Sequence, residues 1–319
     1  MNKSAANEKI SFHPRNKHQG QYNFEALCAS LPDLAKYITT NVHGGETIDF
    51  SNPEAVIALN KALLFNHYNL KYWEIPENYL CPPIPGRAEY IHRIADVLAG
   101  SNFGKIPEGP NVKCVDVGVG ANAIYPIIAH CEYGWSFIGS DIDEGALASA
   151  KEIFAQNDLS ENLKVKKQSR DRDLLYGIIE KIDKVDLVVC NPPFHASAKD
   201  AKEGNERKNK NLGIETEGNS ALNFGGQSNE LYCPGGERQF VSKLIKESKN
   251  FAENVFWFSS LISKKDNVRD LQKAIKKLGA TDVRTLNMAQ GNKNSRVIMW
   301  TFLNQEEQLL WKNSRWTKR

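Results

Sequence analysis

Between residues 112 and 302, short apolar runs alternate with longer amphipathic segments, and this alternation restricts the possible folds most strongly. The apolar runs predict seven strands, at residues 112–117, 136–140, 163–167, 185–190, 255–259, 282–286 and 297–302. Helices are expected between them at 123–131, 144–156, 174–181, 237–251 and 267–278. This order predicts an α/β fold with a doubly wound, mostly parallel sheet. The loop between the last two strands is short, so one of them should be antiparallel.

The first predicted strand runs into a glycine-rich turn, Asp116-Val117-Gly118-Val119-Gly120-Ala121-Asn122, and then into a helix. Glycines permit a tight turn and the close approach of a ligand to the backbone. Asp141 ends the next strand, where its carboxylate can accept hydrogen bonds from both hydroxyls of a ribose. The segment therefore predicts a site for a cofactor that contains a nucleoside.

Two cofactors fit this turn. Gly118, Gly120 and Ala123 match the spacing of the dinucleotide fingerprint, with an acid about twenty residues further on. S-adenosylmethionine (SAM) is favoured by Asp116, because a carboxylate there can face the zwitterionic methionine part of the ligand. In a dinucleotide site the same carboxylate would face a pyrophosphate and repel it.

The fourth predicted strand ends abruptly at Asn191-Pro192-Pro193-Phe194. Two prolines cannot donate backbone hydrogen bonds, so the strand stops there. Pro192 also keeps Asn191 out of the helical region. The result is a stiff corner with an amide side chain, carbonyl groups and an aromatic ring, which suits a planar substrate with an amine. A proline-terminated strand with a core phenylalanine is the simpler alternative.

The glycine turn and the proline corner should face one crevice, because ligands of open α/β sheets bind beyond the carboxyl ends of the strands at the switch point. An amine such as adenine N6 could donate its two N–H groups to the Asn191 side-chain oxygen and the Pro192 carbonyl. Phe194 would stack on an unpaired base. Positioning and electrostatics would supply most of the acceleration. The adjacent His195 is interpreted as a loop residue rather than a base.

Residues before the sheet predict a smaller unit. Residues 1–24 form a basic, irregular arm in which Arg15 and Lys17 are candidate RNA-binding residues, although a solvated end is an equal alternative. Short helices at 24–29 and 32–37, a strand at 47–50 and helices at 53–66 and 87–98 are expected. Proline-rich residues 76–86 mark the boundary between an RNA-binding module, 1–84, and a catalytic domain, 85–319. The last eight residues are also basic.

Residues 195–236 interrupt the alternation with a polar segment that follows the proline corner directly. A long polar loop at the mouth of a site is usually a cover or a disordered insertion, so this one should be mobile without substrate. The six cysteines have no metal-binding spacing, and no apolar run reaches the length of a membrane span. We therefore expect a cytoplasmic protein without a metal and without a membrane segment.

Several motifs together resemble a known family. They are Asp116-x-Gly118-x-Gly120, Asn191-Pro192-Pro193-Phe194, His13-Pro14-Arg15-Asn16, Asp49-Phe50, Pro53-Glu54-Ala55-Val56, Pro85-x-Arg87-x-x-Tyr90-Ile91-His92, Ile124-Tyr125-Pro126 and Pro234-Gly235-Gly236-Glu237. They resemble class I SAM-dependent methyltransferases and, over nearly the whole chain, the RlmF family of bacterial 23S ribosomal RNA adenine-N6 methyltransferases. The eukaryotic METTL-type U6 small nuclear RNA adenine methyltransferase is a relative of that family.

This resemblance implies a class I, Rossmann-like methyltransferase with a small N-terminal RNA-binding module. It implies SAM contacts at Arg87, Gly118, Asn122, Asp141 and, less directly, Asp173, and an acceptor-base site at residues 191–194. The substrate would be adenine 1618 of 23S rRNA, free or in a precursor of the large subunit, and the enzyme would be a monomer. Protein glutamine methylation and non-catalytic RNA binding or ribosome assembly are alternatives. A nicotinamide dehydrogenase is a third.

Overall fold

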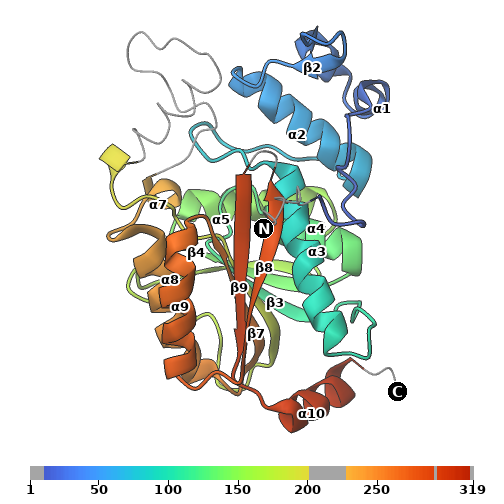
Figure 1. Cartoon of the computed structure of the whole chain (residues 1–319). Coiled ribbons are helices and arrows are strands. Elements are labelled where there is room, and N and C mark those ends of the chain that lie inside the picture. Colours follow the sequence, from blue (N-terminus) through green and yellow to red (C-terminus); the bar gives the residue numbers. More distant parts are fainter. Residues whose placement is uncertain (1–10, 201–227, 291–292, 317–319) are drawn as a thin grey trace, which may run out of the picture.

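A seven-stranded sheet forms the centre of the molecule in the computed structural model, which describes residues 11–200, 228–290 and 293–316 (Figure 1). The strand order is β5-β4-β3-β6-β7-β9-β8. The strands are β3 (Lys113–Val117), β4 (Ser136–Asp141), β5 (Leu163–Lys167), β6 (Val185–Cys190), β7 (Val255–Ile262), β8 (Asp282–Gln290) and β9 (Lys293–Thr301). All neighbours are parallel except β9, which is antiparallel to both β7 and β8. The predicted doubly wound sheet with an antiparallel strand is confirmed.

Helices cover both faces of this sheet, which explains why its central strands are apolar throughout. All six residues of β6 and all eight of β7 are buried. Alternate residues point to opposite faces, so Leu187 and Val189 join one hydrophobic cluster and Val188 and Cys190 join the other. The first cluster includes α3 (Ile84–Gly100), α4 (Ile124–Tyr133) and α5 (Glu144–Gln156). The second includes α8 (Gly236–Ser248) and α9 (Lys265–Lys277).

The N-terminal elements continue the first cluster without a break. They are α1 (Phe24–Ser30), the 3-10 helix η1 (Pro32–Tyr37), β1 (Ile38–Thr40), β2 (Glu46–Ile48) and α2 (Pro53–Tyr68). Figure 1 shows them in blue at one end of the molecule. Asn52 caps α2 through the N–H groups of Glu54 and Ala55, as its position before Pro53 predicts. Buried Trp73 and Leu63 belong to the same cluster as the residues of α3.

Residues 174–181 do not form the predicted helix. They form turns that bury Leu175 and Ile178 in the second cluster. Gly177 has a φ of 77°, and the N–H groups of Leu174 and Leu175 donate to the carboxylate of Glu247 on α8. The apolar residues are buried as their spacing predicts, but the left-handed backbone at Gly177 interrupts a helix at its centre.

The C-terminal part differs from expectation in two further ways. The predicted loop at 287–296 is mostly strand, because β8 extends to Gln290, β9 begins at Lys293, and the two strands pair along their whole length. Residues 291–292 lie outside the described part. The helix α10 (Gln305–Arg315) was not predicted. Its signal is a capping box, in which Asn304 and Glu307 bond each other's backbone N–H groups.

The buried carboxylate of Asp186 on β6 holds α10 against the sheet. Its oxygens accept hydrogen bonds from the indole N–H of Trp311 (2.7 Å) and of Trp316 (2.8 Å), and from the Lys113 backbone N–H (2.7 Å). The Arg315 guanidinium forms a bidentate pair with the same carboxylate, at 2.6 and 3.0 Å. Arg315, one of the basic residues near the end of the chain, is therefore neutralised inside the protein.

We predict that Asp186→Ala is strongly destabilising, by roughly 3–5 kcal/mol, because the variant leaves a partly buried guanidinium and two indole N–H groups without their acceptor. Urea unfolding of the variant and of the exposed control Glu253→Ala measures this. A loss below about 1 kcal/mol relative to the control would contradict the central role of Asp186.

Candidate active site

The predicted crevice is present at the carboxyl ends of β3 and β6. These strands are parallel neighbours, and Val117 pairs with Cys190, so Gly118 and Asn191 begin the two adjacent loops. The cleft and the open space at its mouth together enclose about 960 Å³. Its walls come from residues far apart in the chain, among them Arg87, Gly118, Gly120, Asn122, Asp141, Asp173, Asn191 and Pro193.

The glycine-rich turn is held open by its bonds to the end of β4. Gly118 and Gly120 have φ angles of 78° and 63°, in the left-handed region that favours glycine. The N–H of Gly118 donates to the Ser140 carbonyl (2.9 Å), and the N–H of Gly120 donates to the Asp141 carboxylate (3.0 Å). A Cβ on Gly118 would meet no atom within 4 Å, so the turn leaves space for a ligand next to the backbone.

Glycine is also required beneath the turn, at Gly139 on β4. A Cβ at this position would lie 2.6 Å from a methyl group of Val119, closer than real Cβ atoms approach. Gly139 therefore lets the turn pack directly on the strand that carries Asp141. Burial raises the pKa of Asp141, while hydrogen bonds from the backbone N–H groups of Asp143 and Gly120 oppose that rise.

Asp116 lies beneath the turn with a carboxylate that the described residues leave unsatisfied. Its side chain is 1% exposed, and neither oxygen has a hydrogen-bond partner in the described part of the chain. Burial and the charge of Asp141 raise its pKa well above the usual range, while Arg87 opposes this. An unpaired buried carboxylate is costly, so this position fits a cationic ligand group. The open turn, the acid at the end of β4 and this carboxylate together fit SAM.

Arg87 on α3 connects the cofactor side of the cleft to the proline corner. Its guanidinium donates to the Tyr125 hydroxyl (3.1 Å) and, at 3.5 Å, to the side-chain oxygen of Asn191. It also lies over the Tyr125 ring, 5.5 Å from the centroid. A cation at the start of a helix is unfavourable, and the first turn of α3 contains no acid that would offset it. The position of Arg87 is therefore explained by its contacts with Tyr125 and Asn191.

The proline corner is braced from below by α3 and β7. The Tyr90 hydroxyl donates to Ser259 Oγ (2.9 Å), which in turn donates to the Val188 carbonyl (2.7 Å). Pro192 and Pro193 are buried, and Phe194 is half-buried against the first hydrophobic cluster. His195 forms a parallel bridge with Tyr232.

Comparison with known proteins agrees with this geometry. Residues 6–304 match the model of a family described as RNA methyltransferase. The chain is 51% identical over 309 residues to "Ribosomal RNA large subunit methyltransferase F" of Cytophaga hutchinsonii, covering 97% of this chain and 96% of that one. The protein of the same name from Pseudomonas fluorescens is 47% identical over 314 residues, covering 98% and 92%. This chain belongs to the ribosomal RNA large subunit methyltransferase F family.

Two solved structures resemble this family member over 92% of its length. The catalytic domain of human METTL16 in complex with a MAT2A 3′UTR hairpin superimposes with a TM-score of 0.78 at 28% identity, covering 96% of that chain. The N-terminal domain of human METTL16 in complex with SAH superimposes with a TM-score of 0.73 at 26% identity, covering all of that chain. The fold is thus that of a class I methyltransferase, and the protein is a SAM-dependent RNA methyltransferase. The predicted family, fold, enzyme class and cofactor are confirmed.

All seven residues predicted to bind the cofactor lie in or directly beneath one cleft in this methyltransferase. Asn191 and Pro193 also line it, with Pro192 and Phe194 beside them. Their individual roles stay predictions. Sequence reasoning did not identify Leu80, Gln168, Asp171, Glu230 and Phe240, which line the same cleft. Only Gln168 had a usable signal, since it directly follows β5 at the carboxyl edge of the sheet.

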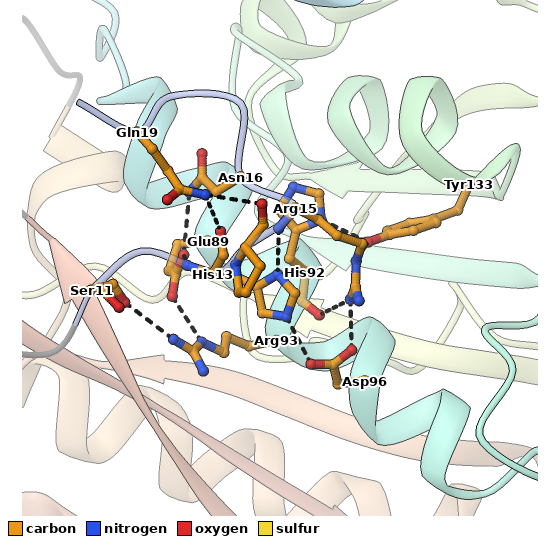
Figure 2. Close-up of polar contacts among 11 residues, drawn as sticks. Ser11, His13, Arg15, Asn16, Gln19, Glu89, His92, Arg93, Asp96 and Tyr133 are labelled. Atoms are coloured by element: carbon orange, nitrogen blue, oxygen red, sulfur yellow. Dashed lines mark hydrogen bonds and ion pairs between the residues drawn. The ribbon is translucent and has the colours of Figure 1, made fainter. Parts of the chain in front are cut away.

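The predicted RNA-binding residues Arg15 and Lys17 are both paired within the protein. Residues 11–23 form no helix or strand, but they are bound to α3 and α4 (Figure 2). Arg15 donates to Asp96 (2.6 Å), to the Tyr133 hydroxyl (3.0 Å) and to the His92 carbonyl (3.1 Å). Lys17 pairs with Glu132 at 2.8 Å. Figure 2 shows the Arg15 side chain directed toward Asp96 and Tyr133.

Buried histidines and Glu89 complete the contact between the arm and α3. His13 donates its backbone N–H to Glu89 (2.7 Å) and contacts Asp96 through Nε2 (2.8 Å). Its ring stacks on His92, with centroids 5.5 Å apart. Burial and neighbouring cationic groups lower the pKa of His92 to about 3, so this ring is neutral. The motif at residues 13–16 therefore fastens the arm to α3.

No group of His, Cys, Asp and Glu side chains suited to a metal ion occurs among residues 11–200, 228–290 and 293–316. Within those ranges there is also no helix that is long and apolar enough to cross a membrane. The first ten residues, most of the polar insertion (201–227) and Lys318 and Arg319 lie outside the described part of the chain. The prediction of mobility for the insertion falls on those residues.

We predict that Asp116→Asn weakens SAM binding roughly tenfold or more, because it removes a buried charge-assisted partner. The same change should raise the stability of the ligand-free protein. The folded-state pKa of Asp116 is raised above the unfolded value of 3.8, so its contribution to stability is present below that value and is lost as the pH rises. The stabilising effect should therefore grow from about pH 5 to about pH 8.

Calorimetric titration with SAM and thermal unfolding at both pH values test the Asp116 prediction, with the exposed substitution Asp33→Asn as the control. Unchanged SAM affinity would show that the carboxylate does not face the cofactor. A stability change independent of pH would show that burial of its charge is not the cause.

We predict that Arg15→Ala lowers the free energy of unfolding by roughly 1–2 kcal/mol, since a partly exposed ion pair and two further hydrogen bonds are lost. Chemical denaturation measures this, with Lys36→Ala in the N-terminal part as a control. RNA affinity should be compared at a temperature where both variants are fully folded. Unchanged stability would contradict the fastening role of the arm.

Proposed function

We propose that this enzyme methylates the N6 amine of a specific adenine in 23S ribosomal RNA, with SAM as the methyl donor. The observation that carries this proposal is the pairing of Val117 with Cys190, which puts the glycine-rich turn and the Asn191–Phe194 corner side by side in one cleft. The proposal is supported by the near full-length relatives named ribosomal RNA large subunit methyltransferase F.

The cofactor would be held by charges and hydrogen bonds that match its parts. When bound, SAM supplies an electrophilic methyl group on a sulfonium. Asp141 would accept from the ribose hydroxyls, and the buried carboxylate of Asp116 would face the ammonium group. Arg87 on the cleft wall would pair with the methionine carboxylate while keeping its contact with Tyr125.

The acceptor amine would be held by the proline corner. The side-chain oxygen of Asn191 and the carbonyl of Pro192 would accept its two N–H groups, which turns the nitrogen lone pair toward the methyl group. Phe194 would stack on the base, which requires an unpaired or extruded nucleotide. No strong base is needed, because the proton can leave to water after transfer. The bracing by Tyr90 and Ser259 keeps this corner rigid.

The RNA partner would be free 23S rRNA or a precursor of the large subunit, and the enzyme would act in the cytoplasm as a monomer without a metal. Residues 1–84 would serve as the RNA-binding module, with Arg15 and Lys17 at its junction with the catalytic domain. The two side chains keep 38% and 42% of their surface exposed, so a phosphate could approach them and share them with their internal carboxylate partners.

We predict that Asn191→Ala and Phe194→Ala each reduce turnover roughly a hundredfold or more while SAM affinity changes less than about threefold, because these side chains position the acceptor rather than the donor. Labelled SAM and ribosomal RNA from cells that lack the enzyme measure turnover, calorimetry measures affinity, and Asn313→Ala on the exposed face of α10 is the control.

Nuclease digestion of the labelled RNA identifies the product as N6-methyladenosine and locates it. Label on another nucleoside, or on a protein glutamine, would overturn the proposed substrate. Full turnover by Asn191→Ala would overturn the proposed role of the corner.

A further inference from the structure

The segment from α7 (Ser228–Leu231) to Gly236 touches both halves of the active site. After Phe194, the N–H of His195 donates to the Leu231 carbonyl (3.1 Å), and the N–H of Cys233 donates to the His195 carbonyl (3.1 Å). One residue before Leu231, the carboxylate of Glu230 accepts the backbone N–H of Leu80 at 3.1 Å. The segment is thus bonded to the proline corner on one side and to the cofactor cleft on the other.

Glu230 completes one wall of the cofactor cleft. Both backbone groups of Leu80 are bound there, since its N–H donates to Glu230 and its carbonyl accepts from the Asn122 side chain (3.2 Å). A Cβ added to Gly120 would lie 3.3 Å from Glu230 Oε1 and 3.4 Å from Asn122 Nδ2. The carboxylate therefore lies next to the glycine-rich turn, beside the space that the cofactor would take.

Among the described residues, the lining of the cleft carries more negative than positive charge. It includes the carboxylates of Asp141, Asp171, Asp173 and Glu230 and the guanidinium of Arg87. Asp173 is paired with Arg170 at 3.6 Å, which leaves three carboxylates and one guanidinium in this part of the lining. Asp116 lies buried beneath them. Like charges within one cleft oppose each other's approach, and a cationic ligand reverses the sign of that interaction. The docked position of Glu230 should therefore be more stable when a positively charged methyl donor is bound.

We propose that Glu230 is a positioning residue that couples the charge of the methyl donor to the order of the acceptor corner, through the bonds of its segment to His195. This inference rests on the proposed function, since it assigns a donor and an acceptor to the two halves of the cleft. SAM carries a net positive charge that the product S-adenosylhomocysteine lacks. The segment is therefore docked more stably, and the proline corner is better ordered for the acceptor base, while SAM is bound. After methyl transfer the docked position of the segment becomes less stable.

Hydrogen exchange of the His195 and Cys233 amides tests the coupling directly, because both amides are protected only while the segment is docked. Two unreactive ligands separate charge from occupancy. Sinefungin carries a protonated amine in place of the methylsulfonium, and S-adenosylhomocysteine has no charge there. In the native protein at saturation, sinefungin should protect the two amides at least about fivefold more than S-adenosylhomocysteine.

Two variants divide the role of the Glu230 side chain. Glu230→Gln keeps an oxygen that can accept the Leu80 N–H but has no charge. The segment should still dock, and the two ligands should protect the two amides equally, with a ratio of about one. Glu230→Ala should lose both the difference and the basal protection. Glu161→Gln, at an exposed acid on another surface, should behave like the native protein. A persistent difference in Glu230→Gln, or equal protection by both ligands in the native protein, would overturn the proposal.

Methyl transfer to RNA by the native protein, measured in parallel, separates this inference from the proposed function. Transfer to adenine without charge-dependent protection overturns the coupling alone. Charge-dependent protection without transfer to RNA overturns the proposed substrate and leaves the coupling in place.

Discussion

The parallel pairing of β3 with β6 is the constraint on which the rest of the active site depends. Both strands are central and buried, and their registers bring Val117 opposite Cys190. Every element of the proposed chemistry follows from where these two strands stop. A glycine-rich turn ends one strand and a double proline ends the other, so a flexible backbone cradle and a stiff corner share one edge. A shift of the pairing by one residue would reverse the faces of every side chain in the strand.

Two buried aspartates on these strands show how hydrogen bonding separates structure from function. Asp186 on β6 is saturated by two indoles, a guanidinium and a backbone N–H, and it fixes α10. Asp116 on β3 is equally buried but has no partner in the described part of the chain. A buried charge without a partner costs stability, so its presence is explained by a ligand that supplies the missing partner. Both carboxylates are buried, so their roles are distinguished by whether the described residues supply them with hydrogen-bond partners.

The sequence predicted those parts of the structure whose causes are local. Prolines end β6, glycines bend the chain at Gly118 and Gly120, and alternating apolar runs define the sheet. Two of the failures involve contacts that form only in the folded chain. Residues 174–181 form turns around Gly177, and Glu247 on α8 accepts the backbone N–H groups of Leu174 and Leu175. Glu230 belongs to a polar segment with no motif of its own, and only the folded chain brings it to Leu80. The capping box of α10 was the exception, since its signal is local and was available.

Of all the sequence signals, the charge of a segment was the poorest guide to which side chains are free to bind RNA. The basic arm suggested a surface open to RNA, yet Arg15 pairs with Asp96 and Lys17 with Glu132. Arg315, in the basic C-terminal segment, likewise pairs with Asp186. A cation already paired with a carboxylate adds little to the long-range field that attracts RNA. For Arg15 and Lys17 to bind a phosphate, the phosphate has to share or replace the internal partner, and loosening the arm then opposes binding. RNA contact at this junction would therefore be linked to the docking of the arm on α3, rather than to the net charge of the segment.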